Sequence, residues 1–181
     1  MRTGLVVVVV ILLAASSVSA QPRGNPSLGV YFDEAGMNAD GYYSGIISVV
    51  HFYLFARNLE QVGAVRFQLE MDPRMFVYAD SLSLPPSTVS GSPETGVQID
   101  YDPVLDGDNT GIVLLGEGDF IVYGVGMIFE VDVLPHPDDA VILVDSADGA
   151  GWVPATGRTG WLFYEVAVEE LRWGEVKALY Q

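Results

Sequence analysis

The sequence predicts an all-β protein whose strands form a β-sandwich or a barrel. Short segments rich in β-branched and aromatic residues recur along the chain, clusters of Gly, Pro, Asp and Ser separate them, and helical periodicity is nearly absent. Ten strands are expected, at residues 28–33, 45–57, 62–72, 75–79, 96–101, 111–115, 120–123, 125–134, 140–144 and 161–168.

Residues 1–20 are expected to be a secretory signal peptide. Arg2 precedes an uncharged apolar run at residues 4–15, and Val18 and Ala20 occupy the −3 and −1 positions of a cleavage site before Gln21. The alternative is an uncleaved membrane anchor, which is disfavoured because the run is shorter than the roughly 20 residues that span a bilayer. The mature protein is therefore expected to be secreted and soluble outside the cytoplasm, with no membrane contact after cleavage.

Two of the expected strands have the clearest patterns. In residues 62–72, the apolar Val65, Phe67, Leu69 and Met71 alternate with polar residues, which indicates one packed side and one side facing solvent. Residues 45–57 are long and rich in β-branched and aromatic side chains, as expected of a buried strand.

Two segments are expected to be loops, and the end of the chain has two interpretations. Residues 81–96, with their prolines and serines, should form the most exposed connection, and residues 155–160 should form another loop. In the tail, residues 169–181, Trp173, Val176 and Leu179 recur at helical spacing, although Gly174 costs a helix about 1 kcal/mol relative to alanine. A short C-terminal helix and a final irregular strand both remain open, and the β-domain is expected to span residues 21–168.

The composition indicates one acidic domain stabilised by a packed core. Removal of residues 1–20 leaves 161 of the 181 residues, which is enough for a single domain. The whole chain has 24 Asp and Glu against 8 Lys and Arg, and the loss of Arg2 changes its net charge from −16 to about −17. This charge disfavours nucleic acid and anionic membranes as partners and favours cations and basic proteins. The chain has no Cys, so no disulfide contributes to its stability.

The order of the segments resembles the cohesin family over about residues 45–168. The resemblance rests on the run YLFARNLEQVGAVRFQLEMDPRMFVYADSLSLPP at residues 53–86, whose alternating strand ends in a corner at Asp72 and Pro73, and on the later segments VQIDYDPVLDGDNTGIVLLGEGDF and GVGMIFEVDVL. It implies a nine- to ten-stranded antiparallel β-sandwich of jelly-roll type. Cellulosomal cohesins bind a dockerin on one sheet face, but this chain has one domain and no recognisable dockerin or scaffold linker. No residue of that binding face is carried over.

The segment DGDNTGIVLLGE, Asp106–Glu117, matches much of a twelve-residue calcium loop. Oxygen-bearing side chains occupy its positions 1, 3, 5 and 12, and a glycine occupies position 6. These residues are Asp106, Asp108, Thr110, Glu117 and Gly111. The flanks contradict a helix–loop–helix site because both are strand-like, and a strand about 10 Å or more long would separate Glu117 from the other acids. A turn between two strands, as in a hairpin, is therefore favoured.

The remaining acidic residues and the histidines give little support for chemistry. One structural Ca²⁺ held by acidic loops is compatible with the sequence, and a solvated acidic rim is the alternative. The acidic residues concerned are Asp100, Asp102, Asp106, Asp108, Asp138, Asp139, Asp145 and Asp148. His51 lies in a strand-like apolar run, His136 lies between two prolines, and neither belongs to a nucleophile, zinc or phosphate-binding motif. No enzyme activity is expected, and no catalytic residue, cofactor or metal ligand is assigned.

Two groups of aromatic residues could fill the core or bind a partner. They are Tyr42, Tyr43, Phe52, Tyr53 and Phe55 in one group, and Trp152, Trp161, Phe163, Tyr164 and Trp173 in the other. Because neighbouring residues of a strand face opposite sides, Phe52 and Tyr53 should do so, and about half of these rings should fill the core. Trp152, in the segment GAGWVP, is the ring most expected to be exposed.

Three functions remain compatible with the sequence. The leading hypothesis is a secreted, non-catalytic, cohesin-like module that mediates protein–protein interaction in an extracellular or cell-surface assembly. The second is a carbohydrate-binding sandwich for a polysaccharide, which requires two or three coplanar exposed aromatic rings. The third is a structural subunit of a surface layer or filament, which predicts exposed, unpaired edge strands.

Overall fold

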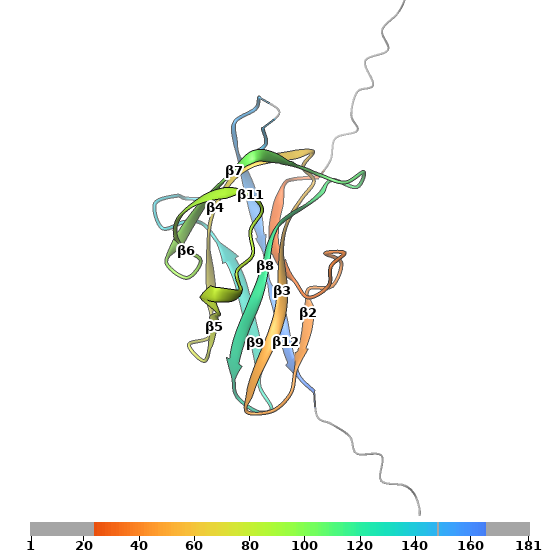
Figure 1. Cartoon of the computed structure of the whole chain (residues 1–181), viewed down its shortest axis with the longest axis vertical. Helices are drawn as coiled ribbons and strands as arrows, with labels where there is room; N and C mark the ends of the chain where they lie inside the picture. The colour runs from red at the N-terminus through yellow and green to blue at the C-terminus, as the bar shows by residue number, and fades with distance from the viewer. Residues whose placement is uncertain (1–23, 148, 166–181) are drawn as a thin grey trace, which may run out of the picture.

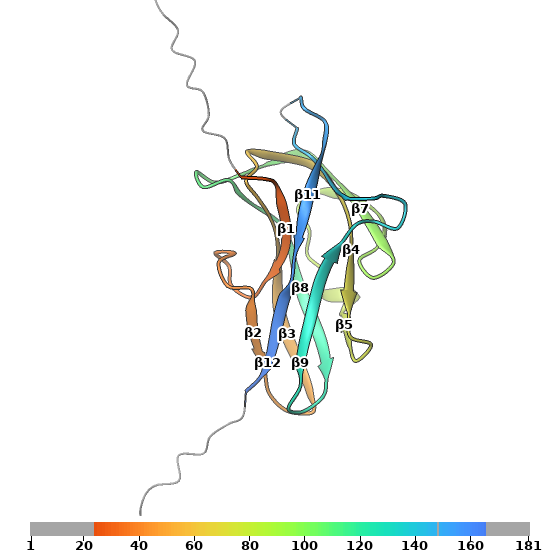
Figure 2. The ribbon, with the colours of Figure 1, turned by 180° about the vertical axis from the view of Figure 1, so that it is seen from behind.

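The structure is a computed structural model that describes residues 24–147 and 149–165. In these residues the chain forms twelve strands and one short 3-10 helix, Ala79–Ser81, arranged as an elongated β-sandwich (Figures 1 and 2). The strands are β1 (Ser27–Tyr31), β2 (Asp40–Tyr43), β3 (Ile47–Arg57), β4 (Gln61–Met71), β5 (Met75–Val77), β6 (Ser87–Ser92), β7 (Gly96–Asp106), β8 (Ile112–Tyr123), β9 (Ile128–Leu134), β10 (Ile142–Asp145), β11 (Trp152–Arg158) and β12 (Gly160–Tyr164).

The twelve strands belong to one hydrogen-bonded sheet that folds over into two layers. One layer has the order β5-β8-β3-β1. In the other layer, β7 lies between β6 and β4. Along its other edge, β4 pairs with β10 through residues 64–66 and with β9 through residues 68–71. Strand β9 pairs in turn with β12, and β12 pairs with β2. Strand β11 pairs with β10 and with β1, so it joins the two layers at one corner.

Most pairings are antiparallel, as expected, but strands from the two ends of the described chain pair in parallel. Ser27 of β1 lies opposite Thr156 of β11, and Tyr43 of β2 lies opposite Tyr164 of β12. The sheet is therefore mixed, and its first strands are held by its last ones.

A large apolar core fills the space between the layers, and a second, small cluster of Tyr31, Ala39 and Phe55 packs apart from it. The alternation predicted for β4 is confirmed, because Val65, Phe67 and Leu69 are buried while Arg66 and Gln68 remain partly exposed. Among the described residues, the largest fully buried side chains of the main core are Phe67, Phe120, Phe129, Leu28, Leu115 and Leu162.

Three strands lie where none was expected. Strand β2 was not predicted, β6 lies within the segment 81–96, and β11 covers most of the segment 155–160. The prediction of loops at the last two places was wrong, because these strands are specified by pairing and not by apolar side chains. All six residues of β6 pair with β7, although none of them is buried. Strand β11 pairs on both of its edges.

Two further expectations about strands are corrected by the structure. Residues 111–115 and 120–123 belong to one strand, β8, because Gly116 and Gly118 interrupt the apolar pattern without ending the strand. Both glycines lie where a neighbouring side chain leaves little room for a Cβ atom. A Cβ at Gly118 would lie 3.2 Å from the Phe52 ring, and one at Gly116 would overlap Leu84. Strand β3 is also not buried on both sides, since Ile47, Val49 and His51 are exposed.

Several expectations lie outside the described residues. These are the signal peptide at residues 1–20, the end of the strand predicted at 161–168, and the helix or strand of the tail, residues 169–181. Among residues 24–147 and 149–165, no helix has the length and apolarity needed to cross a membrane.

Candidate functional site

The outer face of β2, β12, β9 and β4 carries a row of exposed apolar side chains. Phe163 of β12 lies opposite Tyr42 of β2 on one side and opposite Ile128 of β9 on the other. Tyr42 is 62% exposed and Ile128 is 60% exposed, and the ring centroids of Tyr42 and Phe163 lie 6.1 Å apart. The alternation of these three strands places the row on the side away from the core.

Acidic residues lie directly beside this apolar row. In the next register position, Trp161 lies between Asp40 and Glu130, and further along Glu70 of β4 lies opposite Asp132 of β9. We call this surface the acidic-aromatic face. It consists of Asp40, Tyr42, Glu70, Ile128, Glu130, Asp132, Trp161 and Phe163. A shallow depression of about 440 Å³ lies on the β4 and β9 side of this face, and its lining includes both Glu70 and Glu130.

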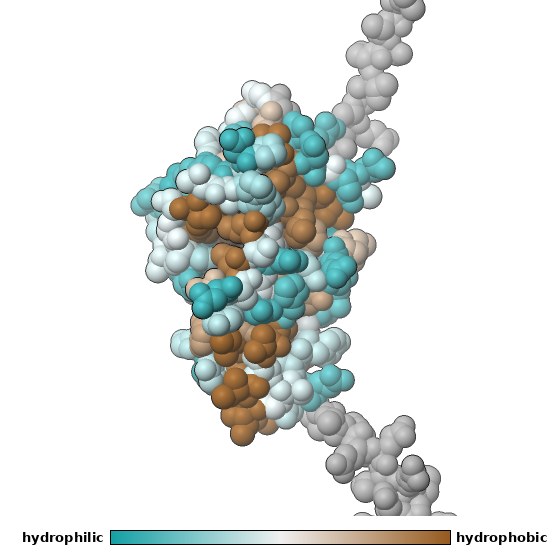
Figure 3. All heavy atoms as spheres, in the orientation of Figure 1, coloured by the Kyte–Doolittle hydropathy of each residue, from teal (hydrophilic) through white to brown (hydrophobic). Residues whose placement is uncertain are grey.

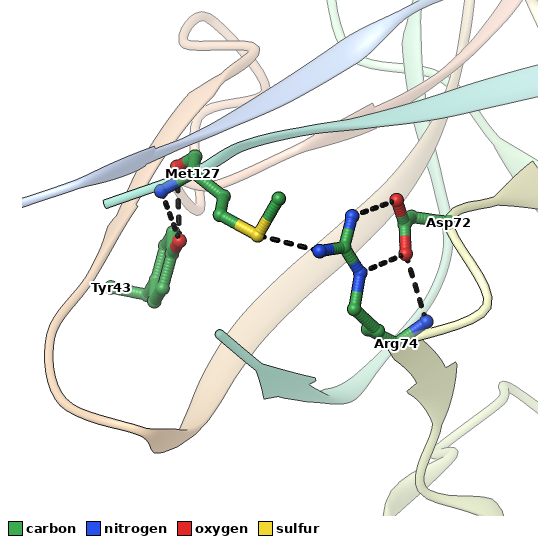
Figure 4. A network of polar contacts seen from close by, with 4 residues as sticks. All are labelled: Tyr43, Asp72, Arg74 and Met127. Carbon is green, nitrogen blue, oxygen red and sulfur yellow. Dashed lines mark hydrogen bonds and ion pairs between the residues drawn. The ribbon is translucent and has the colours of Figure 1, made fainter. Parts of the chain in front are cut away.

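The charges along the depression are not all available to a partner. At one end, Arg74 binds Asp72 through two side-chain hydrogen bonds, 2.8 Å from Nε and 2.6 Å from its terminal nitrogen (Figure 4). Hydrogen bonding from Arg74 lowers the pKa of Asp72 to about 2. Glu70 and Glu130, in contrast, form no ion pair within the described part of the chain. These two carboxylates are free to attract a cationic group.

Arg74 is also held by a small network of contacts at the start of β9. Tyr43 donates a hydrogen bond of 2.9 Å to the carbonyl oxygen of Met127 and accepts one of 3.1 Å from its backbone N–H (Figure 4). The guanidinium of Arg74 contacts the sulfur of Met127 and lies 5.4 Å from the centroid of Phe129. The network fixes the turn before β9, and with it the end of the apolar row at Ile128.

The opposite outer face, formed by β3, β8 and β5, carries a second apolar cluster. Ile47 of β3 lies opposite Tyr123 of β8, and in the next exposed row Val49, Ile121 and Phe76 lie side by side on β3, β8 and β5. The rings of Phe76 and Tyr123 stack at 5.8 Å. With Ile46 and Val125 in the adjoining connections, these residues define the apolar patch, visible as the lower brown area in Figure 3. Its members are the exposed Ile46, Ile47, Val49, Phe76, Tyr123 and Val125 and the partly exposed Ile121.

A polar belt crosses the same face beside the patch. His51 Nδ1 lies 2.8 Å from Asp119, and His51 Nε2 lies 3.7 Å from Glu117. Tyr53 packs edge-on against His51 at 4.8 Å, and partial desolvation together with the charges of Glu34 and Glu117 raises the pKa of Tyr53. The belt is seen as a teal band above the patch in Figure 3. It limits the apolar patch to one end of the face.

Within the segment Asp106–Glu117, residues 107–111 form a turn between β7 and β8, as predicted, but not a hairpin turn, because these strands lie in different layers. Oδ1 of Asp108 accepts hydrogen bonds from the backbone N–H groups of Thr110 (2.8 Å) and Ile112 (2.9 Å) and from the Thr110 hydroxyl. These bonds, led by the one from Ile112, lower the pKa of Asp108. Glu117 lies within β8 opposite Tyr53, so it does not converge on the turn.

Asp102 is exposed, and most of the other acidic residues considered as calcium ligands have local partners. Asp139 lies 3.2 Å from Arg66, and Asp138 lies 3.9 Å from the same side chain, which also contacts His136. Further hydrogen bonds link Asp100 to Gln98, Asp106 to Gln61, and Asp145 to the backbone of Ala147. Asp148 lies outside the described residues. Within residues 24–147 and 149–165, no three His, Asp or Glu side chains are grouped so that they could hold a metal ion.

The aromatic residues divide between the core and the surface as expected. Tyr43, Phe52 and Phe55 are buried while Tyr42 is exposed, and Phe52 and Tyr53 face opposite sides. Trp152 is exposed, as predicted, although it begins β11 and does not lie in a loop. Trp173 lies outside the described residues.

Sequence reasoning missed the residues that complete the two surfaces. Glu70, Glu130 and Ile128 were not singled out, and neither were Ile47 and Val49. Their strands had been recognised, but the side-by-side register of β4, β9 and β12, or of β3 and β8, was needed to gather them.

This architecture is a cohesin-like β-sandwich. A non-cellulosomal cohesin from the hyperthermophilic archaeon Archaeoglobus fulgidus is similar with a TM-score of 0.55 and 12% identity, over 80% of this chain and 94% of that chain. The third ScaB cohesin of R. flavefaciens, in complex with a group 1 dockerin, is similar with a TM-score of 0.50 and 10% identity, over 80% of this chain and 99% of that chain. The resemblance expected from the sequence is thereby confirmed for the fold.

The likeness is one of structure and not of sequence. No protein-family model matches the chain, and no curated protein matches it.

Proposed function

We propose that the protein is a secreted, non-catalytic module that binds a basic protein partner through the acidic-aromatic face, as part of an extracellular or cell-surface assembly. The cohesin-like fold supports a binding role, because the R. flavefaciens cohesin with this architecture is in complex with a dockerin. The expected signal peptide at residues 1–20 supports the extracellular setting.

One observation carries the proposal: an exposed apolar row lies beside carboxylates that form no ion pair with any residue that the structure describes. Tyr42, Phe163 and Ile128 can supply the desolvated centre of an interface, while Glu70 and Glu130 can orient a basic partner and speed its association. The surface is also open and shallow, which suits a protein better than a small molecule that needs an enclosing pocket.

A capture experiment tests the proposal. The chain from Gln21 to Gln181 is immobilised and exposed to the proteins of its native extracellular medium, with and without a calcium chelator. We expect a protein partner in stoichiometric amount in both samples. The variant Glu130→Lys is expected to lose it, because the new charge repels a basic partner. The matched control is Asp80→Lys, which makes the same charge change at an exposed site on the 3-10 helix.

Other outcomes of this experiment would contradict the proposal. Loss of the partner in both variants would point to net charge alone, and retention in both would remove the acidic-aromatic face from the interface. Loss on chelation would indicate a calcium-dependent site instead.

The two alternative functions predict different captured material. A carbohydrate-binding sandwich would recover glycan, but the rings of Tyr42 and Phe163 are tilted by 39° and make no flat platform for a sugar. A filament subunit would recover the protein itself. Strands β2, β5 and β6 lie at the edges of the layers, and the shortness of β2 and β5, with four and three residues, limits their pairing with a second chain.

A further inference from the structure

The apolar patch is unusual for the outer face of a β-sandwich. Such faces are normally polar, and the alternation of β3 should place polar side chains at its outward positions. Ile47 and Val49 instead occupy two of these positions and are 62% and 66% exposed. Ile46 and Val125 are also exposed, and they extend the patch past the ends of β3 and β8. A contiguous patch of this kind commonly marks a surface that is covered in the functioning protein.

Charge argues against a second copy of the chain as the cover. The chain has a net charge of −16, and Asp119 and Glu117 of the polar belt lie next to the patch. Two copies meeting through this face would bring two strongly negative molecules and two acidic belts together, which long-range repulsion opposes. A segment that binds this patch should therefore be apolar, have a net charge near zero, and carry Lys or Arg side chains that can contact the acidic residues of the polar belt.

The residues that follow the described domain have this composition. In residues 166–181, three glutamates are nearly balanced by Arg172 and Lys177, and the apolar residues include Trp173, Val176 and Leu179. We propose that residues 166–181 dock on the apolar patch of their own chain, with Arg172 or Lys177 reaching the polar belt.

The place where the described chain ends supports this assignment. The backbone N–H of Glu165 donates a hydrogen bond of 2.8 Å to the carbonyl oxygen of Tyr43, at the end of β2. Glu165 also lines one shallow depression together with Ile47 and Val49. The tail therefore starts at the border of the patch and needs no long linker to reach it.

The length of the tail is also sufficient. Sixteen residues span about 50 Å if extended and about 24 Å if helical. The patch covers three neighbouring strands, about 10 Å across, since adjacent strands lie about 4.8 Å apart. A tether this short gives an effective concentration on the order of millimolar, so even a weak contact is populated.

A spin-label experiment tests the proposal. The chain has no cysteine, so Val176→Cys provides a unique attachment site for a nitroxide in the chain from Gln21 to Gln181. We expect the NMR methyl signals of Ile47, Val49 and Ile121 to be lost by broadening. The signal of Ile128 should be broadened less, because this residue lies on the other outer face, although it is cross-strand from Phe163, near Glu165, and close in sequence to Val125. Equal broadening of Ile47 and Ile128 would indicate a tail that does not dock, and would overturn the proposal.

Two matched controls separate the remaining explanations. Val49→Glu should release the tail and reduce the broadening of Ile47 to that of Ile128, whereas Val89→Glu, the same change at an exposed site on β6, should leave Ile47 more strongly broadened than Ile128. Unchanged broadening in Val49→Glu would overturn the proposal. So would broadening in a mixture of spin-labelled chain and isotope-labelled unmodified chain, because the cover would then be a second copy. None of these outcomes depends on whether the acidic-aromatic face binds a partner.

Discussion

Asp72 shows how a single charged residue contributes to the rim of the candidate site. Its carboxylate accepts hydrogen bonds from the side chain and the backbone N–H of Arg74, at the corner between β4 and β5. The pair removes one negative charge from the depression, and Asp132 accepts a hydrogen bond from Thr159, which leaves Glu70 and Glu130 as the acids of its lining without a side-chain partner among the described residues. Asp72 therefore stabilises the turn between β4 and β5, and the two glutamates are the residues that would attract a basic partner.

The substitution Asp72→Asn is expected to destabilise the protein in a pH-dependent manner. The pKa of Asp72 is lowered from 3.8 to about 2, so the ionised form stabilises the fold above about pH 4, and this contribution is lost as the pH falls toward 2. Since the pair is partly exposed, the loss at pH 7 should be below about 1 kcal/mol. Thermal unfolding at pH 7 and pH 2 measures it, with Glu130→Gln as the control that should change neither melting temperature. A penalty for Asp72→Asn that persists at pH 2 would contradict this account.

The strands show which features of the fold could be read from the sequence. The alternation of Val65, Phe67 and Leu69 predicted β4 and its buried side correctly, because burial on one face leaves a period of two. Strand β6 carries no buried residue and β8 is interrupted by Gly116 and Gly118, so neither shows this period along its length. Their hydrogen bonds to neighbouring strands define them, and such pairing leaves no mark on the single sequence.

The turn at residues 108–111 gives a prediction that separates a structural role from metal binding. Oδ1 of Asp108 holds the backbone N–H groups of Thr110 and Ile112, so Asp108→Ala is expected to lower the melting temperature. Asp108→Asn keeps an oxygen acceptor and should retain much of the stability. Thermal melts with added Ca²⁺ or with a chelator should give the same values for the unmodified chain. A rise with Ca²⁺ that both variants abolish would show that the turn is a metal site.

Strand β11 depends on a close backbone approach at the corner where the two layers meet. Leu28 of β1 lies opposite Gly157, and a Cβ at Gly157 would overlap the carbonyl oxygen of Val133 on β9. Gly157→Ala is therefore expected to cost about 1–3 kcal/mol, as overpacking does in a rigid site. Urea unfolding measures the change. The control is Gly24→Ala, where the nearest atom is the flexible Asn58 amide nitrogen at 3.3 Å and only a small effect is expected. Equal losses in the two variants would mean that the corner can relax.

At the scale of the whole molecule, the sequence predicted the architecture better than the site. The resemblance to cohesins led to the correct sandwich, and the structural likeness to two cohesins covers 80% of the chain. The acidic-aromatic face could not be found in this way, because Tyr42, Ile128 and Phe163 are far apart in sequence and meet only through two strand pairings. One of those pairings is parallel and involves β2, a strand that was not predicted. A surface assembled from distant strands requires the register, which a pattern of residues does not contain.

Because β1 pairs with β11 and β2 pairs with β12, the β-sandwich should form completely only when β12 is present. Among the described strands, β2 pairs with β12 alone, and β12 places Leu162 in the core without exposure. A chain ending at residue 158 should therefore lose amide protection in β2, and β9 should lose it along the edge that faced β12. A chain ending at residue 165 keeps β12 and is the control, because it should retain this protection. Hydrogen exchange measures both. If the amides of β2 stayed protected in the shorter chain, another contact would have to hold β2, and the acidic-aromatic face would not depend on closure.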